Sequence, residues 1–66
     1  MNKKELELLE KYNIKSSDLI EFQKSVQGMG IMEWKAKGRE FRNKFFIDTD
    51  FEAVQIIRIA ENWDIE

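Results

Sequence analysis

Residues 31–47 decide what this chain folds into, because their pattern fits both an amphipathic helix and a β-hairpin. In the helical interpretation, large apolar residues and one glycine recur at steps of three and four and form a single stripe. This stripe consists of Ile31, Trp34, Gly38, Phe41 and Phe45. Two pairs of opposite charge four residues apart, Glu33 with Lys37 and Glu40 with Lys44, would support the helix.

In the hairpin interpretation, the chain turns at Lys37-Gly38 and Trp34 lies opposite Phe41, which makes one side of the hairpin aromatic. The other side carries two cross-strand pairs of opposite charge. These pairs are Glu33 with Arg42 and Lys35 with Glu40. Gly38 favours the hairpin, because glycine inside a helix costs about 1 kcal/mol relative to alanine, whereas a tight turn uses its positive φ. We therefore predict a hairpin and keep a helix over residues 31–46 as the alternative.

The segment before this region has the pattern of two amphipathic helices. Residues 2–12 place leucines on one side of the first helix, and Asn13 is suited to end it in a left-handed conformation. A second helix follows, and Asp18 and Glu21 have the spacing of a capping box at its start. The glycines at 28 and 30 are expected to stop it.

The C-terminal segment predicts a further helix from about Asp50 to about Trp63. Thr49 and Glu52 have the spacing of a capping box at its start. The apolar side chains of this helix occupy about half of its circumference. They are Ala53, Ile56, Ile57, Ile59, Ala60 and Trp63. Because so wide an arc exceeds what packing on one side requires, we expect a weak or moderate two-fold homodimer through Ile56, Ile59 and Trp63.

These elements predict a single small α+β domain over residues 1–66, with two N-terminal helices, a hairpin and a C-terminal helix. The alternative is an all-α bundle with residues 31–46 helical. A chain of 66 residues buries a small core, and without cysteine it forms no disulfide. Close packing or self-association is therefore the expected source of its stability.

Three stretches, LLEKYNIKSSDLIEF, GREFR and DFEAV, give the chain a resemblance to the small winged-helix domains of phage excisionases and MerR-type regulators. In those domains a helix-turn-helix is followed by a two-stranded wing and a further helix. The residues that match the wing and the start of the next helix are Gly38, Arg39, Phe41 and Arg42, and Asp50, Glu52 and Ala53. The resemblance implies a small DNA-binding regulator. The small size, the single domain and the lack of a catalytic inventory would also suit a phage or mobile-element accessory protein.

The inventory of reactive side chains argues against an enzyme. The chain has neither histidine nor cysteine, so its serines have no evident general base, and we expect no catalytic residue and no cofactor. The sequence DTDFE at 48–52 resembles the start of a calcium loop. Ala53 and Ile59, however, stand where that loop needs glycine and glutamate, so we expect no metal site.

Positive charge is concentrated in residues 28–47, which carry a net charge of +3, whereas residues 48–66 carry −5. A basic hairpin of this kind can contact a phosphate backbone, so double-stranded DNA is one expected partner. The predicted nucleic-acid-binding residues are Lys35, Lys37, Arg39, Arg42 and Lys44 on the hairpin, with Lys15 and Lys24 on the helices before it.

The alternative function is a protein-binding regulator or inhibitor that uses an aromatic surface and the acidic C-terminal helix. Both functions are non-enzymatic, and the residues do not decide between them. No apolar run in the chain is long enough for a signal peptide or a membrane span, so we expect a cytoplasmic protein with no membrane partner.

Overall fold

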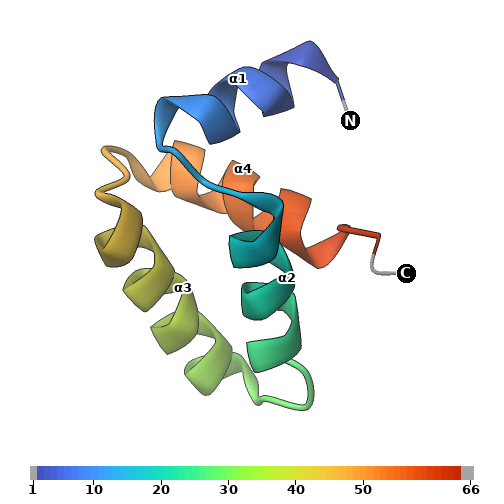
Figure 1. Ribbon diagram of the computed structural model, residues 1–66. Helices are drawn as coiled ribbons and strands as arrows, with labels where there is room; N and C mark the ends of the chain where they lie inside the picture. Colours follow the sequence, from blue (N-terminus) through green and yellow to red (C-terminus); the bar gives the residue numbers. More distant parts are fainter. Residues whose placement is uncertain (1, 65–66) are drawn as a thin grey trace.

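The computed structural model describes residues 2–64 of the chain, and within them it contains four α-helices and no strand (Figure 1). The helices are α1 (Lys3–Lys11), α2 (Ser16–Ser25), α3 (Ile31–Phe45) and α4 (Asp50–Glu61). The protein is therefore a small all-α fold. The predicted α+β fold with a hairpin wing is wrong, and the alternative with residues 31–46 helical describes this part of the chain.

Gly38 explains why the hairpin prediction failed. It is buried in the middle of α3, where a Cβ atom would lie 3.3 Å from Cδ1 of Ile57 on α4. The glycine thus allows two helices to approach closely, and this packing offsets its unfavourable helix propensity. From sequence alone, a glycine required by packing cannot be distinguished from one required by a turn.

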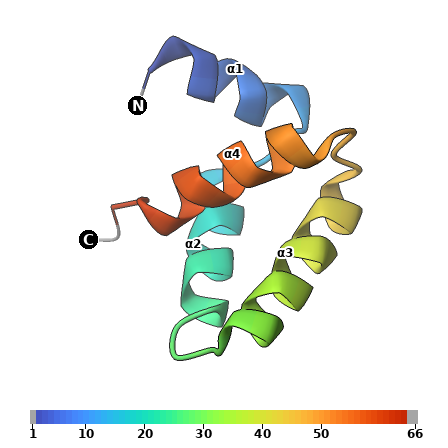
Figure 2. The ribbon, with the colours of Figure 1, turned by 180° about the vertical axis from the view of Figure 1, so that it is seen from behind.

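Helix α4 is the centre of the fold, because it packs against all three other helices. Figures 1 and 2 show it crossing between α1 and the pair formed by α2 and α3. Its buried side chains are Ala53, Ile56, Ile57, Ile59 and Ala60. Leu19 of α2 and Ile56 of α4 are fully buried and mark the middle of the core. Each of the other helices therefore packs part of its apolar surface against α4.

Aromatic side chains join α2 to α3. The rings of Phe22 and Phe41 meet edge to face with centroids 5.0 Å apart, and the Phe45 ring lies 4.8 Å from that of Phe41. Phe41 is buried and Phe45 packs against the core at its edge. These two aromatics of α3 therefore serve packing, in which edge-to-face contacts add to the burial of apolar surface.

The helix starts agree only in part with the predicted caps. Thr49 caps α4 as predicted, because its side chain accepts a hydrogen bond from the Glu52 N–H at 3.1 Å. The prediction of Asp18 and Glu21 as the capping box of α2 is wrong, since the helix begins three residues earlier than that spacing implied and its N-cap is Lys15. Asp18 is the third residue of the helix and accepts a hydrogen bond from the N–H of Lys15 at 2.9 Å.

The ends of α1 and α3 share one backbone motif. Asn13 and Phe46 both adopt the left-handed conformation, with φ of 56° and 55°. The N–H of the next residue then bonds back to the helix, from Ile14 to the Leu9 carbonyl and from Ile47 to the Arg42 carbonyl. This is the Schellman pattern. The left-handed ending predicted at Asn13 is confirmed.

Candidate binding surface

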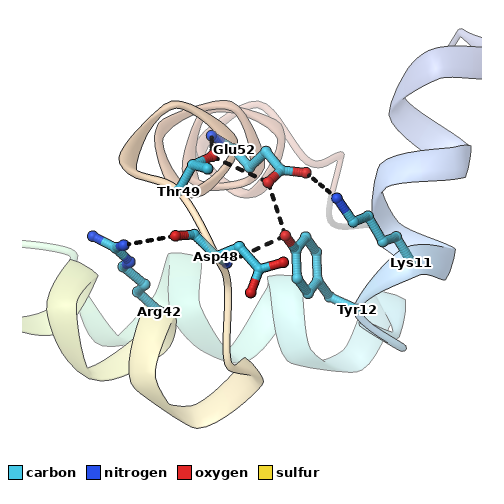
Figure 3. Close-up of polar contacts among 6 residues, drawn as sticks. All are labelled: Lys11, Tyr12, Arg42, Asp48, Thr49 and Glu52. Carbon is cyan, nitrogen blue, oxygen red and sulfur yellow. Dashed lines mark hydrogen bonds and ion pairs between the residues drawn. The ribbon is translucent and has the colours of Figure 1, made fainter.

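A polar network links the end of α1 to the start of α4 (Figure 3). Glu52 accepts hydrogen bonds from Lys11 Nζ and Tyr12 Oη, each at 2.8 Å, and from Thr49 Oγ1 at 3.1 Å. The Asp48 N–H donates to Tyr12 Oη at 3.2 Å. The hydrogen bond from Lys11, followed by that from Tyr12, lowers the pKa of Glu52, and the same bond to Glu52 raises the pKa of Lys11. Both groups stay charged at neutral pH, so the network acts as a structural clamp.

Arg42 forms a second clamp on the connection between α3 and α4. Its Nε donates to the Ile47 carbonyl at 3.1 Å, Nη2 donates to the Asp48 carbonyl at 3.2 Å, and Nη1 pairs with the Asp50 carboxylate. Figure 3 shows the contact between Arg42 and Asp48. The predicted role of Arg42 in phosphate binding therefore competes with an internal role for the same guanidinium group.

Helix α3 also separates the other predicted basic residues into two groups. Lys37 pairs with Glu40 at 3.3 Å, and Lys44 lies over the Phe45 ring at 5.4 Å from its centroid. At 100° per residue, Lys37 and Lys44 project to the opposite side of the helix from Lys35. The hairpin tip predicted at Lys37 does not exist, and its neighbours do not form one basic patch.

The side of α3 that faces away from the core carries the remaining cations. We define the outer face of α3 as Ile31, Met32, Lys35, Arg39 and Asn43, with Phe46 just past the helix end. The helical members project within an arc of about 120°, and all six residues are exposed. Lys35 and Arg39 have no ion-pair partner among residues 2–64. Helix α3 forms one edge of the molecule, so this face is open (Figures 1 and 2).

Apolar side chains stand at both ends of the outer face. Ile31 and Met32 are 72% and 80% exposed at its start, and Phe46 is 83% exposed at its end. Phe46 also borders an open hollow of about 430 Å³. The hollow is lined by Arg39, Arg42, Asn43, Phe46 and Ile47. The structure thus combines large exposed apolar groups with free guanidinium and amide donors.

Sequence reasoning missed Phe46, because the hairpin interpretation placed it in a strand within the run Phe45-Phe46-Ile47. A helical projection contains the signal that could have identified it. At 100° per residue, position 46 falls with Lys35 and Arg39, whereas Phe41 and Phe45 fall on the side of the core. The structure bears out this division of the three phenylalanines.

The two remaining predicted basic residues belong to a different helix. Lys15 is the N-cap of α2 and Lys24 lies in its last turn, so they stand at opposite ends of that helix. Both are exposed. Neither belongs to the outer face of α3, and the structure therefore does not gather the predicted nucleic-acid-binding residues into one site.

The residues of the predicted dimer interface are buried or partly buried within the chain itself, so they do not form an exposed surface. Ile56 is fully buried, Ile59 is 8% exposed, and Trp63 packs partly buried against the core. The three other helices cover the apolar arc of α4 within one chain.

A second hollow lies on the other side of α4. An open hollow of about 520 Å³ lies between α1 and the end of α4 and is lined by Glu5, Arg58, Ile59, Asn62, Trp63 and Asp64. No three carboxylates of the described residues gather as metal ligands would. Among the described helices, none has the length and apolar character needed to cross a lipid bilayer.

Comparisons of the chain with protein-family models, with curated proteins and with solved structures found no match.

Proposed function

We propose that this protein is a non-catalytic binding module that docks a protein partner through the outer face of α3. The observation that carries the proposal is the exposure of Ile31, Met32 and Phe46 beside Arg39. Arginine, methionine and aromatic residues are enriched at protein interfaces relative to other surfaces. Three large apolar side chains on one open helix face are what an interface of this kind needs.

The shape of the protein supports this proposal. It measures 31 × 30 × 15 Å along its principal axes, so it is flat. Its accessible surface is 4931 Å², about 500 Å² more than the roughly 4400 Å² expected of a compact protein of this mass. A flat molecule with excess surface has room for an interface on its edge, and α3 forms such an edge.

Charge defines the partner further. Lys35 and Arg39 project from the middle of the outer face, and neither pairs with a carboxylate of the described residues 2–64. Complementary charge speeds association and suppresses wrong partners. The surface of the partner should therefore carry acidic residues opposite Lys35 and Arg39, with apolar residues on both sides of them. The affinity should fall as the salt concentration rises.

Double-stranded DNA is the second candidate, and one observation favours it. Lys35, Arg39 and Asn43 follow one another at intervals of four residues along an exposed helix, and arginine and asparagine are suited to guanine and adenine edges in the major groove. Base edges and phosphates are mainly polar partners, so three large exposed apolar side chains, Ile31, Met32 and Phe46, are better matched by a protein surface. The protein partner is therefore the leading proposal.

A peptide-display selection on the purified protein tests the two candidates. We expect peptides of about 16 residues, matching the length of α3, to be enriched when they combine Asp or Glu with large apolar residues. The double variant Lys35→Glu/Arg39→Glu should weaken their binding by about tenfold or more. The control Lys3→Glu/Lys4→Glu makes the same change in charge on α1 and should change affinity by less than about twofold.

Gel-shift titration with a mixed-sequence duplex at low salt is the competing measurement. If no peptide is enriched and the protein binds the duplex with an affinity that Lys35→Glu/Arg39→Glu abolishes, DNA is the partner and the protein-partner proposal is wrong.

A further inference from the structure

We infer that Phe46 is the anchor of this interface, inserting its ring into an apolar pocket of the protein partner while a carboxylate of that partner enters the hollow beside Arg39. This inference rests on the proposed function and names the contact that carries it. Its starting point is that Phe46 is unfavourable for the isolated chain in two independent ways.

The first unfavourable feature is the backbone of Phe46. Its φ and ψ are 55° and 44°, the left-handed region that glycine and asparagine adopt more readily than phenylalanine. The second is the side chain, which is 83% exposed and so gains little from packing. A strained residue whose side chain contributes little to its own fold indicates a role outside that fold.

The backbone of Phe46 is nevertheless held firmly. Its N–H donates to the Asn43 carbonyl at 3.3 Å, and the N–H of Ile47 donates to the Arg42 carbonyl at 3.1 Å. Ile47 is 4% exposed, and the Arg42 side chain bonds its carbonyl. The aromatic ring thus projects from a fixed turn. An anchor that is already in place loses little conformational entropy when it binds.

The hollow beside Phe46 indicates which group of the partner lies next to the pocket that receives the ring. Arg39 and Asn43, whose side chains carry N–H donors, line it, and Arg42 adds positive charge while it holds the connection to α4. A carboxylate fits such a guanidinium group with two parallel hydrogen bonds. The partner therefore presents an Asp or Glu beside its apolar pocket.

Phe51 provides a matched control. It is 72% exposed and lies in the first turn of α4, where its backbone is helical and ordinary. It lies outside the outer face of α3 and the hollow beside Phe46. If exposure alone determined binding, Phe46 and Phe51 would contribute equally. We expect binding to depend on Phe46 only.

The test measures the affinity of selected acidic peptides for Phe46→Asn and Phe51→Asn. Asparagine is suited to the left-handed backbone, so Phe46→Asn should stay folded by circular dichroism while affinity falls by about tenfold or more. Phe51→Asn should change affinity by less than about twofold. Replacing the large apolar residues of the peptide with alanine should remove the difference between the wild type and Phe46→Asn.

Phe46→Tyr gives a second readout that leaves the ring in place. A hydroxyl buried in an apolar pocket lacks a partner, so affinity should fall several-fold, whereas a ring that stays in solvent would show no change. If Lys35→Glu/Arg39→Glu abolishes binding while both Phe46 variants bind normally, the anchor is wrong and the proposed function stands. If no peptide is enriched, or if no variant changes affinity, both are wrong.

Discussion

The ends of α1 and α3 have the same backbone geometry but different residues at its centre. Asn13 and Phe46 both take the left-handed conformation, and each is followed by a buried isoleucine, Ile14 or Ile47. Asparagine suits that conformation and phenylalanine does not. The comparison shows that the buried isoleucine and the backbone hydrogen bonds determine the motif. The residue in the left-handed position can then be selected for another purpose.

The polar groups beside the two ends differ as well. At the end of α1, Lys11 and Tyr12 hold Glu52, whereas at the end of α3, Arg42 holds backbone carbonyls and Asp50. Both groups attach to the first turn of α4 or to the residues just before it. The two helix ends are thus tied to the same region by separate side chains.

The largest predicted effects come from the two isoleucines. Ile14→Ala and Ile47→Ala should each lower the free energy of unfolding by about 2–4 kcal/mol, because each leaves a cavity beside α4 or its start. Urea denaturation at neutral pH measures both losses. Ile14→Val and Ile47→Val, at about 1 kcal/mol each, serve as variants that stay folded. A loss at only one of the two positions would show that the motifs are not equivalent.

Much of the fold was predictable from the regular pattern of its helices. The Thr49 cap, the apolar arc of α4 and the left-handed end at Asn13 are local features, and the structure confirms each of them. They were predictable because residues close in sequence determine them. Only half of the predicted Thr49–Glu52 capping box forms, because the Glu52 carboxylate accepts from the side chains of Lys11, Tyr12 and Thr49 instead.

The helical state of residues 31–45, the burial of the predicted dimer residues and the exposed outer face of α3 could not be predicted in the same way. The role of Gly38 depends on Ile57, 19 positions away in the sequence, and the coverage of Ile56 and Ile59 depends on three other helices. The exposure of Phe46 follows from the same tertiary packing. Local patterns contain no information about which helices meet, so these features were found only in the structure.

The second prediction concerns Gly38→Val, because Gly38 and Phe46 are opposite cases of how a residue matches its position. The chain has a glycine where two helices touch and a phenylalanine where the backbone would favour glycine. Valine at position 38 would overlap Ile57 and should lower the free energy of unfolding by about 1–3 kcal/mol. The control is Gly30→Ser, which adds a Cβ at the N-cap of α3 with nothing within 4 Å and keeps a favourable capping residue. Equal losses at both positions would rule out close packing as the reason for Gly38.

The third prediction exchanges the residues of the two left-handed positions. Asn13→Phe should lower the free energy of unfolding by about 1 kcal/mol, and Phe46→Asn should raise it by about 1 kcal/mol, since asparagine tolerates this backbone better. Thermal or urea denaturation of the two variants measures both changes. If Phe46→Asn destabilises the protein, the Phe46 ring contributes to the fold and the argument for an external role weakens.

The smallest predicted effect concerns Glu52, the acceptor for the end of α1. Its pKa is lowered from the ordinary value of 4.5, mainly by the hydrogen bond from Lys11. Folding therefore favours the ionised carboxylate. The contribution to stability is complete above pH 4.5 and is lost as pH falls through the lower pKa of the folded state. The raised pKa of Lys11 has the opposite pH dependence. Its contribution to stability is complete below pH 10.5 and is lost as pH rises through the higher pKa of Lys11 in the folded state.

Glu52→Gln should therefore unfold at a lower temperature than the wild type at neutral pH, and this gap should close as the wild-type carboxylate is protonated in acid. Melting curves between about pH 7 and pH 2.5 measure the gap. It should also narrow at high salt, because Lys11 is more than half exposed. The control Glu40→Gln removes the exposed pair with Lys37, which links neighbouring turns of α3 only, and should show a smaller gap. A gap for Glu52→Gln that persists unchanged at pH 2.5 would mean that hydrogen-bond geometry, and not charge, ties the end of α1 to α4.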